Sequence, residues 1–189
     1  GFDPSRIDAV VVTHTHLDHI GRLPRLVKQG FRGPIFCTGP TSELAEILLL
    51  DAAHLQQEDA GYLNRKGLTK HKPALPLFEE EDVRETLELL RPVPLGEPRE
   101  IAPGLSFRYH EAGHLLGAAS AELRLVEDGR ETTVLFSGDV GRFDAVLTRD
   151  PALAPQADYY VIESTYGNRT HAPLSVLDQL EGVLKRTFA

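Results

Sequence analysis

Four metal-binding side chains fall within six residues in His14-Thr15-His16-Leu17-Asp18-His19. The β-branched run 7–13 precedes them and is typical of a strand covered on both faces, so the cluster begins where that strand ends. In an extended segment His14 and His16 face the same way, and a following turn can aim Asp18 and His19 at a neighbouring point. Imidazole and carboxylate ligands suit zinc and leave manganese or iron open. The pattern predicts one loop that serves two adjacent cations.

Two later segments place the same kinds of side chain just past an apolar strand. Residues 105–109 are followed by Glu111-Ala112-Gly113-His114, and residues 134–136 by Ser137-Gly138-Asp139. Strand ends collect active sites in layered α/β folds. Taken singly, a histidine after a strand is usually a surface residue and a Gly-Asp pair is usually a turn. Together with the first cluster, they indicate that His114 and Asp139 join one metal centre.

The rest of the chain alternates apolar strands with amphipathic helices. Strands are expected at 7–13, 34–38, 105–109, 121–126, 132–136 and 158–162. A tight hairpin is expected at Asp128-Gly129. Helices are expected from Thr41 or Ser42 through His54, over 79–90 and over 174–185, with Gly39-Pro40 as a breaker and no clear element in 56–76. This alternation predicts α/β layers in one domain.

Composition sets the broad class of the protein. With 189 residues, 41% of them hydrophobic and 25% charged, the chain is long enough for one good core. Its formal charge of −8 counts against a simple nucleic-acid-binding module. The charge does not exclude a nuclease, because a site rich in carboxylates gains divalent cations and other segments can supply a basic groove.

Compartment and completeness are constrained by a few residues. Cys37 is the single cysteine and lies in an apolar run, so it cannot form an internal disulfide, which favours a cytoplasmic protein. The longest aliphatic run, 47–50, is far shorter than the ~20 residues that cross a bilayer, and we expect no membrane association. The chain opens with Gly1-Phe2-Asp3-Pro4 and lacks methionine, so we expect it to be part of a longer protein.

The three metal segments, in this order, resemble the successive metal motifs of the metallo-β-lactamase superfamily. The resemblance narrows to its β-CASP branch at 112–119, AGHLLGAA, and at 163–169, ESTYGNR. That branch comprises RNA- and DNA-processing nucleases akin to the cleavage-and-polyadenylation endonuclease and to bacterial RNA-processing exonucleases. The resemblance spans nearly the whole chain and implies a metallo-β-lactamase-type αββα sandwich.

The resemblance also implies a role for each candidate residue. The first zinc would be held by His14, His16 and His114, the second by Asp18 and His19, and Asp139 would bridge the two. A hydroxide held between two such ions is available near neutral pH, because metal binding can lower the pKa of water to about 7. Asp18 would also act in catalysis by orienting that nucleophile or accepting its proton. Glu163 would be a second catalytic carboxylate near the metals.

The remaining histidines receive no role in this interpretation. His54, His71 and His110 occupy a predicted helix face, a basic loop and a strand end, which are ordinary places for histidine. His171 follows the 163–169 motif, and a surface-loop position is the favoured interpretation.

The family pattern is incomplete in this chain. Residues 1–189 correspond to a partial metallo-β-lactamase domain, an αββα sandwich incomplete at both ends. The family's N-terminal strands, its inserted β-CASP domain and its final histidine motif have no counterpart. The second metal would then have only Asp18, His19 and Asp139. We therefore expect that metal to bind weakly and the chain alone to be weakly active or inactive.

Three functions are compatible with these motifs. The leading hypothesis is a metal-dependent ribonuclease in RNA processing or decay, acting on RNA, preferably single-stranded, with DNA less favoured. The second is a small-molecule hydrolase of the same superfamily, such as a thioesterase or lactonase, which would lack the 163–169 motif. The third is a non-catalytic subunit of an RNA-processing complex, which would usually lose metal ligands. The motifs do not distinguish endonucleolytic from exonucleolytic cleavage, and they leave a homo-oligomer as an option.

Overall fold

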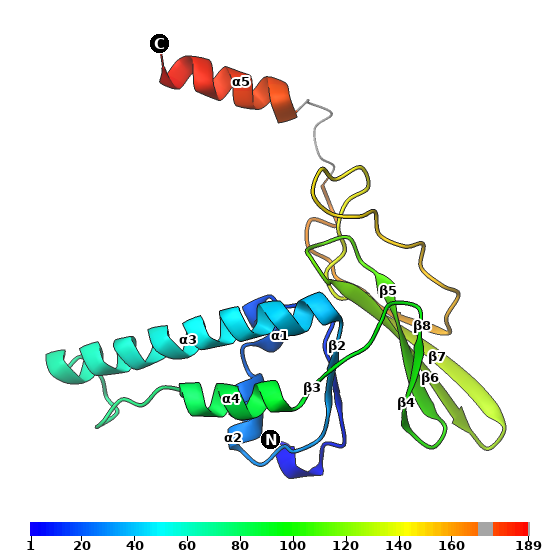
Figure 1. Cartoon of the computed structure of the whole chain (residues 1–189), viewed down its shortest axis with the longest axis horizontal. Coiled ribbons are helices and arrows are strands. Elements are labelled where there is room, and N and C mark those ends of the chain that lie inside the picture. The colour runs from blue at the N-terminus through cyan, green and yellow to red at the C-terminus, as the bar shows by residue number, and fades with distance from the viewer. Residues whose placement is uncertain (170–175, 189) are drawn as a thin grey trace.

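The computed structural model describes residues 1–169 and 176–188, which form two β-sheets and a set of helices (Figure 1). The strands are β1 (Val10–Val11), β2 (Ile35–Cys37), β3 (Leu90–Pro92), β4 (Pro98–Ala102), β5 (Leu105–Glu111), β6 (Ala119–Glu127), β7 (Arg130–Phe136) and β8 (Tyr159–Val161). The helices are α1 (Leu17–Ile20), α2 (Leu23–Lys28), α3 (Gly39–Lys66), α4 (Glu80–Glu88) and α5 (Val176–Thr187), with a 3-10 turn at Pro4–Arg6. The sheet orders are β1-β2-β3 and β4-β5-β6-β7-β8, and the predicted α/β class is confirmed.

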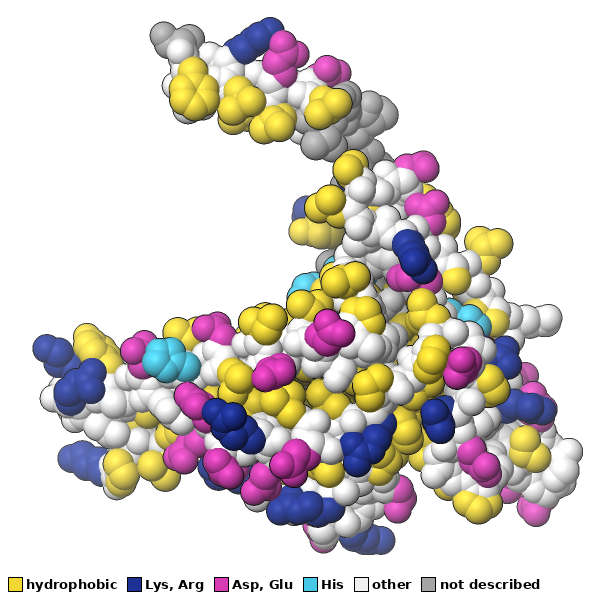
Figure 2. Space-filling view, in the orientation of Figure 1, with side chains coloured by type: hydrophobic (Ala, Val, Ile, Leu, Met, Phe, Trp, Pro, Cys, Tyr) yellow, Lys and Arg dark blue, Asp and Glu magenta, His cyan; other side chains and the backbone are white. Residues whose placement is uncertain are grey.

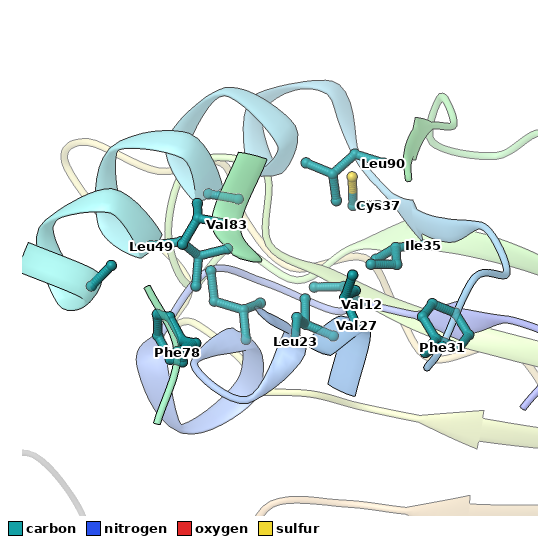
Figure 3. Close-up of a cluster of buried hydrophobic side chains, with 13 residues drawn as sticks. Val12, Leu23, Val27, Phe31, Ile35, Cys37, Leu49, Phe78, Val83 and Leu90 are labelled. Atoms are coloured by element: carbon teal, nitrogen blue, oxygen red, sulfur yellow. The ribbon is translucent and has the colours of Figure 1, made fainter. Parts of the chain in front are cut away.

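The first sheet is parallel and carries the main hydrophobic core on its helical side. Figure 3 shows this core, in which Leu49 of α3 and Val83 of α4 lie with Ile35 of β2, and all three are fully buried. Cys37 is buried in the same cluster, as predicted, and burial raises the pKa of its thiol to about 11. Such a thiol stays protonated and packs as a small apolar side chain.

β1 is much shorter than the predicted strand at 7–13. A 3-10 turn at Pro4–Arg6, in which the Ser5 N–H donates to the Asp3 side chain, precedes the strand, and only Val10 and Val11 pair with β2. The prediction that both faces are covered is confirmed. Val10 packs against the helical core, whereas Val11 packs against the cluster between the sheets.

The predicted breaker at Gly39-Pro40 is wrong, because these residues begin α3. Thr38 is the N-cap, and its side-chain oxygen accepts a hydrogen bond from the N–H of Thr41. Proline is tolerated in the first helical turn, where its missing N–H has no intrahelical partner in any case. The helix also runs through the unassigned stretch to Lys66, where Gly67 ends it with a left-handed φ of +65°.

α4 matches the prediction for 79–90 except at its end. Glu79 and Asp82 form a capping box, which fixes the N-terminus as the acidic first turn predicted. The helix stops at Glu88, because Leu90 pairs with Ile35 as the first residue of β3. Neither β3 nor β4 was predicted: β3 has three residues, and β4 (PREIA) lacks an alternating apolar pattern.

The second sheet is antiparallel from β4 to β7, and β8 adds in parallel to β7. The β6–β7 hairpin turns at Asp128 and Gly129 with φ values of +50° and +74°, which confirms the predicted tight turn. α5 begins at Val176, so the first residues of the predicted helix at 174–185 lie outside the described residues. It lies apart from both sheets (Figure 1), with apolar side chains along one exposed side (Figure 2).

The two sheets meet through a small aromatic cluster. Phe36 of the first sheet packs against Phe107 of the second in a tilted arrangement, with ring centroids 5.2 Å apart, and Phe107 contacts Tyr109. The Tyr109 hydroxyl lies 2.8 and 2.9 Å from the carbonyl oxygens of Val12 and Phe36, so it ties β5 to the residue that follows β1 and to β2. Within residues 1–169 and 176–188, no helix is long and apolar enough to cross a membrane.

Candidate metal centre

The first metal segment leaves β1 at the junction between the sheets. Val12 donates its N–H to Phe36, and the carbonyl of Thr13 accepts from the N–H of Ala119 on β6, so both sheets hold the backbone just before His14. The His14 side chain is completely buried, and its Nδ1 lies 3.1 Å from the Thr13 hydroxyl. This contact leaves Nε2 of His14 to face the cluster.

The chain then turns at once into α1. His16 is the N-cap of this four-residue helix, and Asp18 and His19 lie within it. The turn brings the His14 and His19 rings to a centroid distance of 4.0 Å. The expectation that a turn would aim Asp18 and His19 at a point beside the first two histidines agrees with this arrangement.

The loop that carries His114 is held by contacts that the sequence did not reveal. The hydroxyls of Thr38 and Thr41, at the start of α3, donate to the carbonyl of Gly117 at 2.6 and 3.0 Å. Gly117 has a φ of +83°, and a Cβ there would lie 2.7 Å from the backbone nitrogen of Thr41. A side chain would therefore push the loop off the helix. A threonine before Gly-Pro is an N-cap signal, but the distant carbonyl is not readable from it.

Asp139 follows β7 on a loop that Glu163 anchors. The Val140 N–H donates to Oε1 of Glu163 at 2.7 Å, and the Glu163 N–H donates to the Ser137 hydroxyl at 3.1 Å. Gly138 has a φ of +57°, and a Cβ there would lie 2.7 Å from Cβ of Thr13. Glu163, which the family resemblance places near the metals, thus contacts the chain on both sides of Asp139, through the Ser137 hydroxyl and the Val140 N–H.

Four ligand-type side chains converge on one point. The distances from Nδ1 of His16 are 3.1 Å to Nε2 of His14 and 3.2 Å to Nε2 of His114. Oδ2 of Asp139 lies 3.5, 3.8 and 3.4 Å from the facing nitrogens of the three histidines. A tetrahedral zinc site with bonds of 2.0–2.1 Å has ligand–ligand edges of about 3.3 Å. The four atoms lie within 4.8 Å of one another, so their arrangement fits one such ion.

A second group shares Asp139. Its other oxygen, Oδ1, lies 3.4 Å from Nε2 of His19, which in turn lies 3.6 Å from Oδ2 of Asp18. The two carboxylate oxygens of Asp139 therefore face different groups of side chains. Asp18 is the most open member, with 79% of its side chain exposed, whereas His14 has 1%.

Burial fixes the protonation state of His14. Desolvation lowers the pKa of His14 to about 4, the neighbouring His19 acts in the same direction, and Asp139 opposes them. A neutral imidazole is the form that binds a metal ion, so the buried histidine is prepared for a ligand role near neutral pH.

Comparison with known proteins identifies the family. Residues 2–183 match the model described as the Beta-lactamase superfamily domain. The chain belongs to this superfamily. It is 40% identical to Ribonuclease TTHA0252 of Thermus thermophilus over 100% of this chain and 39% of that protein. It is 35% identical to Transcription termination factor FttA of Methanococcus maripaludis over 88% of this chain and 24% of that protein.

These curated relatives are much longer than the chain, which spans about two-fifths of the first and a quarter of the second. Among solved structures, the subclass B3 metallo-β-lactamase MEM-A1 is similar at 19% identity, with a TM-score of 0.44, over 72% of this chain and 43% of that chain. The superfamily match confirms the resemblance inferred from the metal motifs.

His54, His71 and His110 belong to neither of these two groups. His54 lies 3.6 Å from Glu58 on the surface of α3, and His110 lies 2.7 Å from Glu122 on the neighbouring strand. His71 is exposed, and His171 lies outside the described residues. Ordinary surface and strand positions for His54, His71 and His110 agree with the sequence interpretation.

Proposed function

We propose that this chain is the metal-binding part of a ribonuclease of the β-CASP branch, a metal-dependent phosphodiester hydrolase. The observation that carries the proposal is the Asp139 carboxylate, whose oxygens face the three-histidine group on one side and His19 on the other. Two adjacent cation sites that share one carboxylate suit phosphodiester hydrolysis. Relatives named as a ribonuclease and as a transcription termination factor support RNA as the substrate class.

The residues that would hold the metals form two groups, one for each ion. We assign the first ion to His14, His16, His114 and Asp139, and the second to Asp18, His19 and Asp139. Zinc is the favoured ion because the first group is nitrogen-rich and its edges match tetrahedral bonds, with manganese or iron as alternatives. When bound, the two cations would lower the pKa of a shared water molecule and neutralise charge on the phosphate oxygens.

The chain's own side chains would do the remaining work. Asp18 is exposed beside His19, so its free carboxylate oxygen can orient a water molecule or accept its proton. Glu163 would act as a positioning residue, because its Oε1 holds the N–H of Val140 and so fixes the loop of Asp139. His14, buried and neutral, would keep its nitrogen aimed at the first ion without competition from a proton.

The two ions would be held with unequal strength. The first group offers four side chains, one of them fully buried, whereas the second offers three, including the exposed Asp18. We therefore propose that the chain by itself retains about one zinc ion firmly and cleaves RNA weakly.

Metal analysis combined with cleavage of a labelled single-stranded RNA tests this function. Asp139→Ala should lower the zinc affinity of the chain by more than roughly 10–100-fold, which is the usual effect of losing an outer-shell partner of a metal ligand. The purified variant should therefore contain less zinc than the parent. Asp18→Ala should keep the first zinc and lose the residual cleavage. His54→Ala, a surface histidine on α3, is the matched control and should behave as the parent.

Other outcomes point to the alternative functions. Hydrolysis of a thioester or lactone by a zinc-loaded chain that leaves RNA intact would replace the ribonuclease with a small-molecule hydrolase. Zinc binding equal in the parent and in Asp139→Ala would remove the metal centre itself from the proposal.

A further inference from the structure

A hollow of about 510 Å³ opens beside the metal centre. Its lining includes His114 and Asp139 on the side of the metal cluster, and Arg142, Tyr166 and Arg169 from the two loops beyond β7 and β8. Its volume lies within the range of small-molecule sites, which is roughly 300–1,000 Å³. Whatever fills this hollow lies against the side chains that would hold the first ion.

The lining of the hollow also carries two arginine side chains, Arg142 and Arg169. Neither Arg142 nor Arg169 forms an ion pair with any residue in the described ranges 1–169 and 176–188. Glu163, the carboxylate among the described lining residues that lies outside the metal groups, already accepts the N–H of Val140. Arginine is the side chain best suited to bind phosphate, because its planar guanidinium can donate two parallel hydrogen bonds.

An exposed aromatic ring lies next to these cations. Tyr166 is 62% exposed, and the guanidinium of Arg169 lies 5.6 Å from its ring centroid. Its backbone has a φ of +55°, which is uncommon for a bulky residue and is held by a tight turn, with Gly167 N–H bonded to Ser164 and Arg169 N–H bonded to Tyr166. Strain of this kind collects at ligand-binding sites, because the surrounding structure must maintain it.

We propose that Arg142, Tyr166 and Arg169 form a nucleotide subsite for single-stranded RNA. The two guanidinium groups would bind the phosphate next to the scissile one, and the Tyr166 ring would stack on the adjoining base. Aromatic stacking and arginine contacts are the two ways in which proteins hold single strands without reading sequence. The inference rests on the proposed ribonuclease function and deepens it, because it names the side chains that would hold the RNA strand beside the metal centre.

The arginine–phosphate contact depends on salt concentration, whereas the stacking of Tyr166 on a base does not, and the test uses this difference. Binding of a short labelled single-stranded RNA to the zinc-loaded full chain is measured by fluorescence anisotropy over a range of KCl concentrations. Each phosphate contact with a single strand adds about 0.7 to the slope of log affinity against log salt. Because both guanidinium groups would bind the same phosphate, the double variant R142Q/R169Q should lower the slope by about 0.7.

Tyr166→Ala should instead weaken binding with little change in slope. A stacking contact is worth roughly 5- to 150-fold in affinity. Tyr166→Phe should retain most of the parent affinity, because the ring and not the hydroxyl makes the contact. Arg99→Gln and Tyr62→Ala alter exposed residues of the same types on β4 and α3, and they should match the parent.

The outcomes separate the subsite from the proposed function. Parent-like affinity and slope in both R142Q/R169Q and Tyr166→Ala, with RNA bound and cleaved by the parent, would overturn the subsite and leave the ribonuclease standing. No RNA binding or cleavage by the zinc-loaded parent would overturn both. Loss of zinc in Tyr166→Ala or in R142Q/R169Q would show that these side chains support the metal centre and would contradict the subsite. Zinc content is therefore measured for every variant.

Discussion

The face of the first sheet that packs on the helices is covered more completely than the face of the second sheet that packs on the first. The first sheet lies under α2, α3 and α4, with Ile35, Leu49 and Val83 fully buried (Figure 3). The inward face of the second sheet is buried only where the first sheet covers it, at Phe107, Tyr109 and Ala121. Further along the same face Phe136 is 38% and Val161 51% exposed.

This difference explains where the candidate metal ligands lie. His14 emerges from the covered region and is buried, so its position is set by packing on both sides. Asp139 follows the partly exposed end of β7, and it depends on Glu163 and on the close approach of Gly138 to Thr13. Packing thus fixes one end of the cluster, and hydrogen bonds to a loop fix the other.

The largest expected change in the free energy of unfolding is in the core between the helices and the first sheet. Leu49→Ala removes a fully buried side chain from the core between α3 and the first sheet, and it should lower the free energy of unfolding by about 2–5 kcal/mol. Urea denaturation followed by circular dichroism measures the change. Ile47→Ala, 65% exposed on the same helix, is the control. Equal losses in the two variants would contradict the assignment of this core.

A smaller change in the free energy of unfolding is expected where the two sheets meet. Burial raises the pKa of Tyr109 above its ordinary value, so the hydroxyl stays protonated and donates to the carbonyls of Val12 and Phe36. Tyr109→Phe should cost about 1–3 kcal/mol, because it leaves a buried carbonyl oxygen without its donor. Tyr62→Phe, on an exposed ring, provides the baseline in the same urea titration. A loss no greater than that baseline would mean that the hydroxyl does not couple the sheets.

The sequence could predict where the candidate metal-binding side chains lie relative to the strands, because these positions depend on local rules. A strand that ends before His14, a turn within α1, and polar residues after β5 and β7 are all consequences of neighbouring residues. The Asp128-Gly129 hairpin was predictable for the same reason, since its two left-handed φ values require such residues.

The missed features depend on contacts that are distant along the chain. The start of α3 was misplaced because Gly39-Pro40 reads as a breaker unless Thr38 is recognised as the cap. The hydroxyl of Thr38 also bonds Gly117, 79 residues away. Similarly, β3 is a strand only because Ile35 pairs with Leu90. No local pattern specifies either partner.

The smallest expected change in the free energy of unfolding comes from a comparison of two residues within β6. Leu123 and Leu125 point to the same face of β6, opposite Phe107 and Leu105, but Leu123 packs on the cluster between the sheets and Leu125 is 42% exposed. Leu125→Ala should change the free energy of unfolding by no more than about 0.5 kcal/mol, as at other surface sites. Leu123→Ala should cost more, because its partly buried methyl groups leave a gap in the cluster. Equal costs in urea titrations of the two variants would mean that Leu123 is covered no better than Leu125.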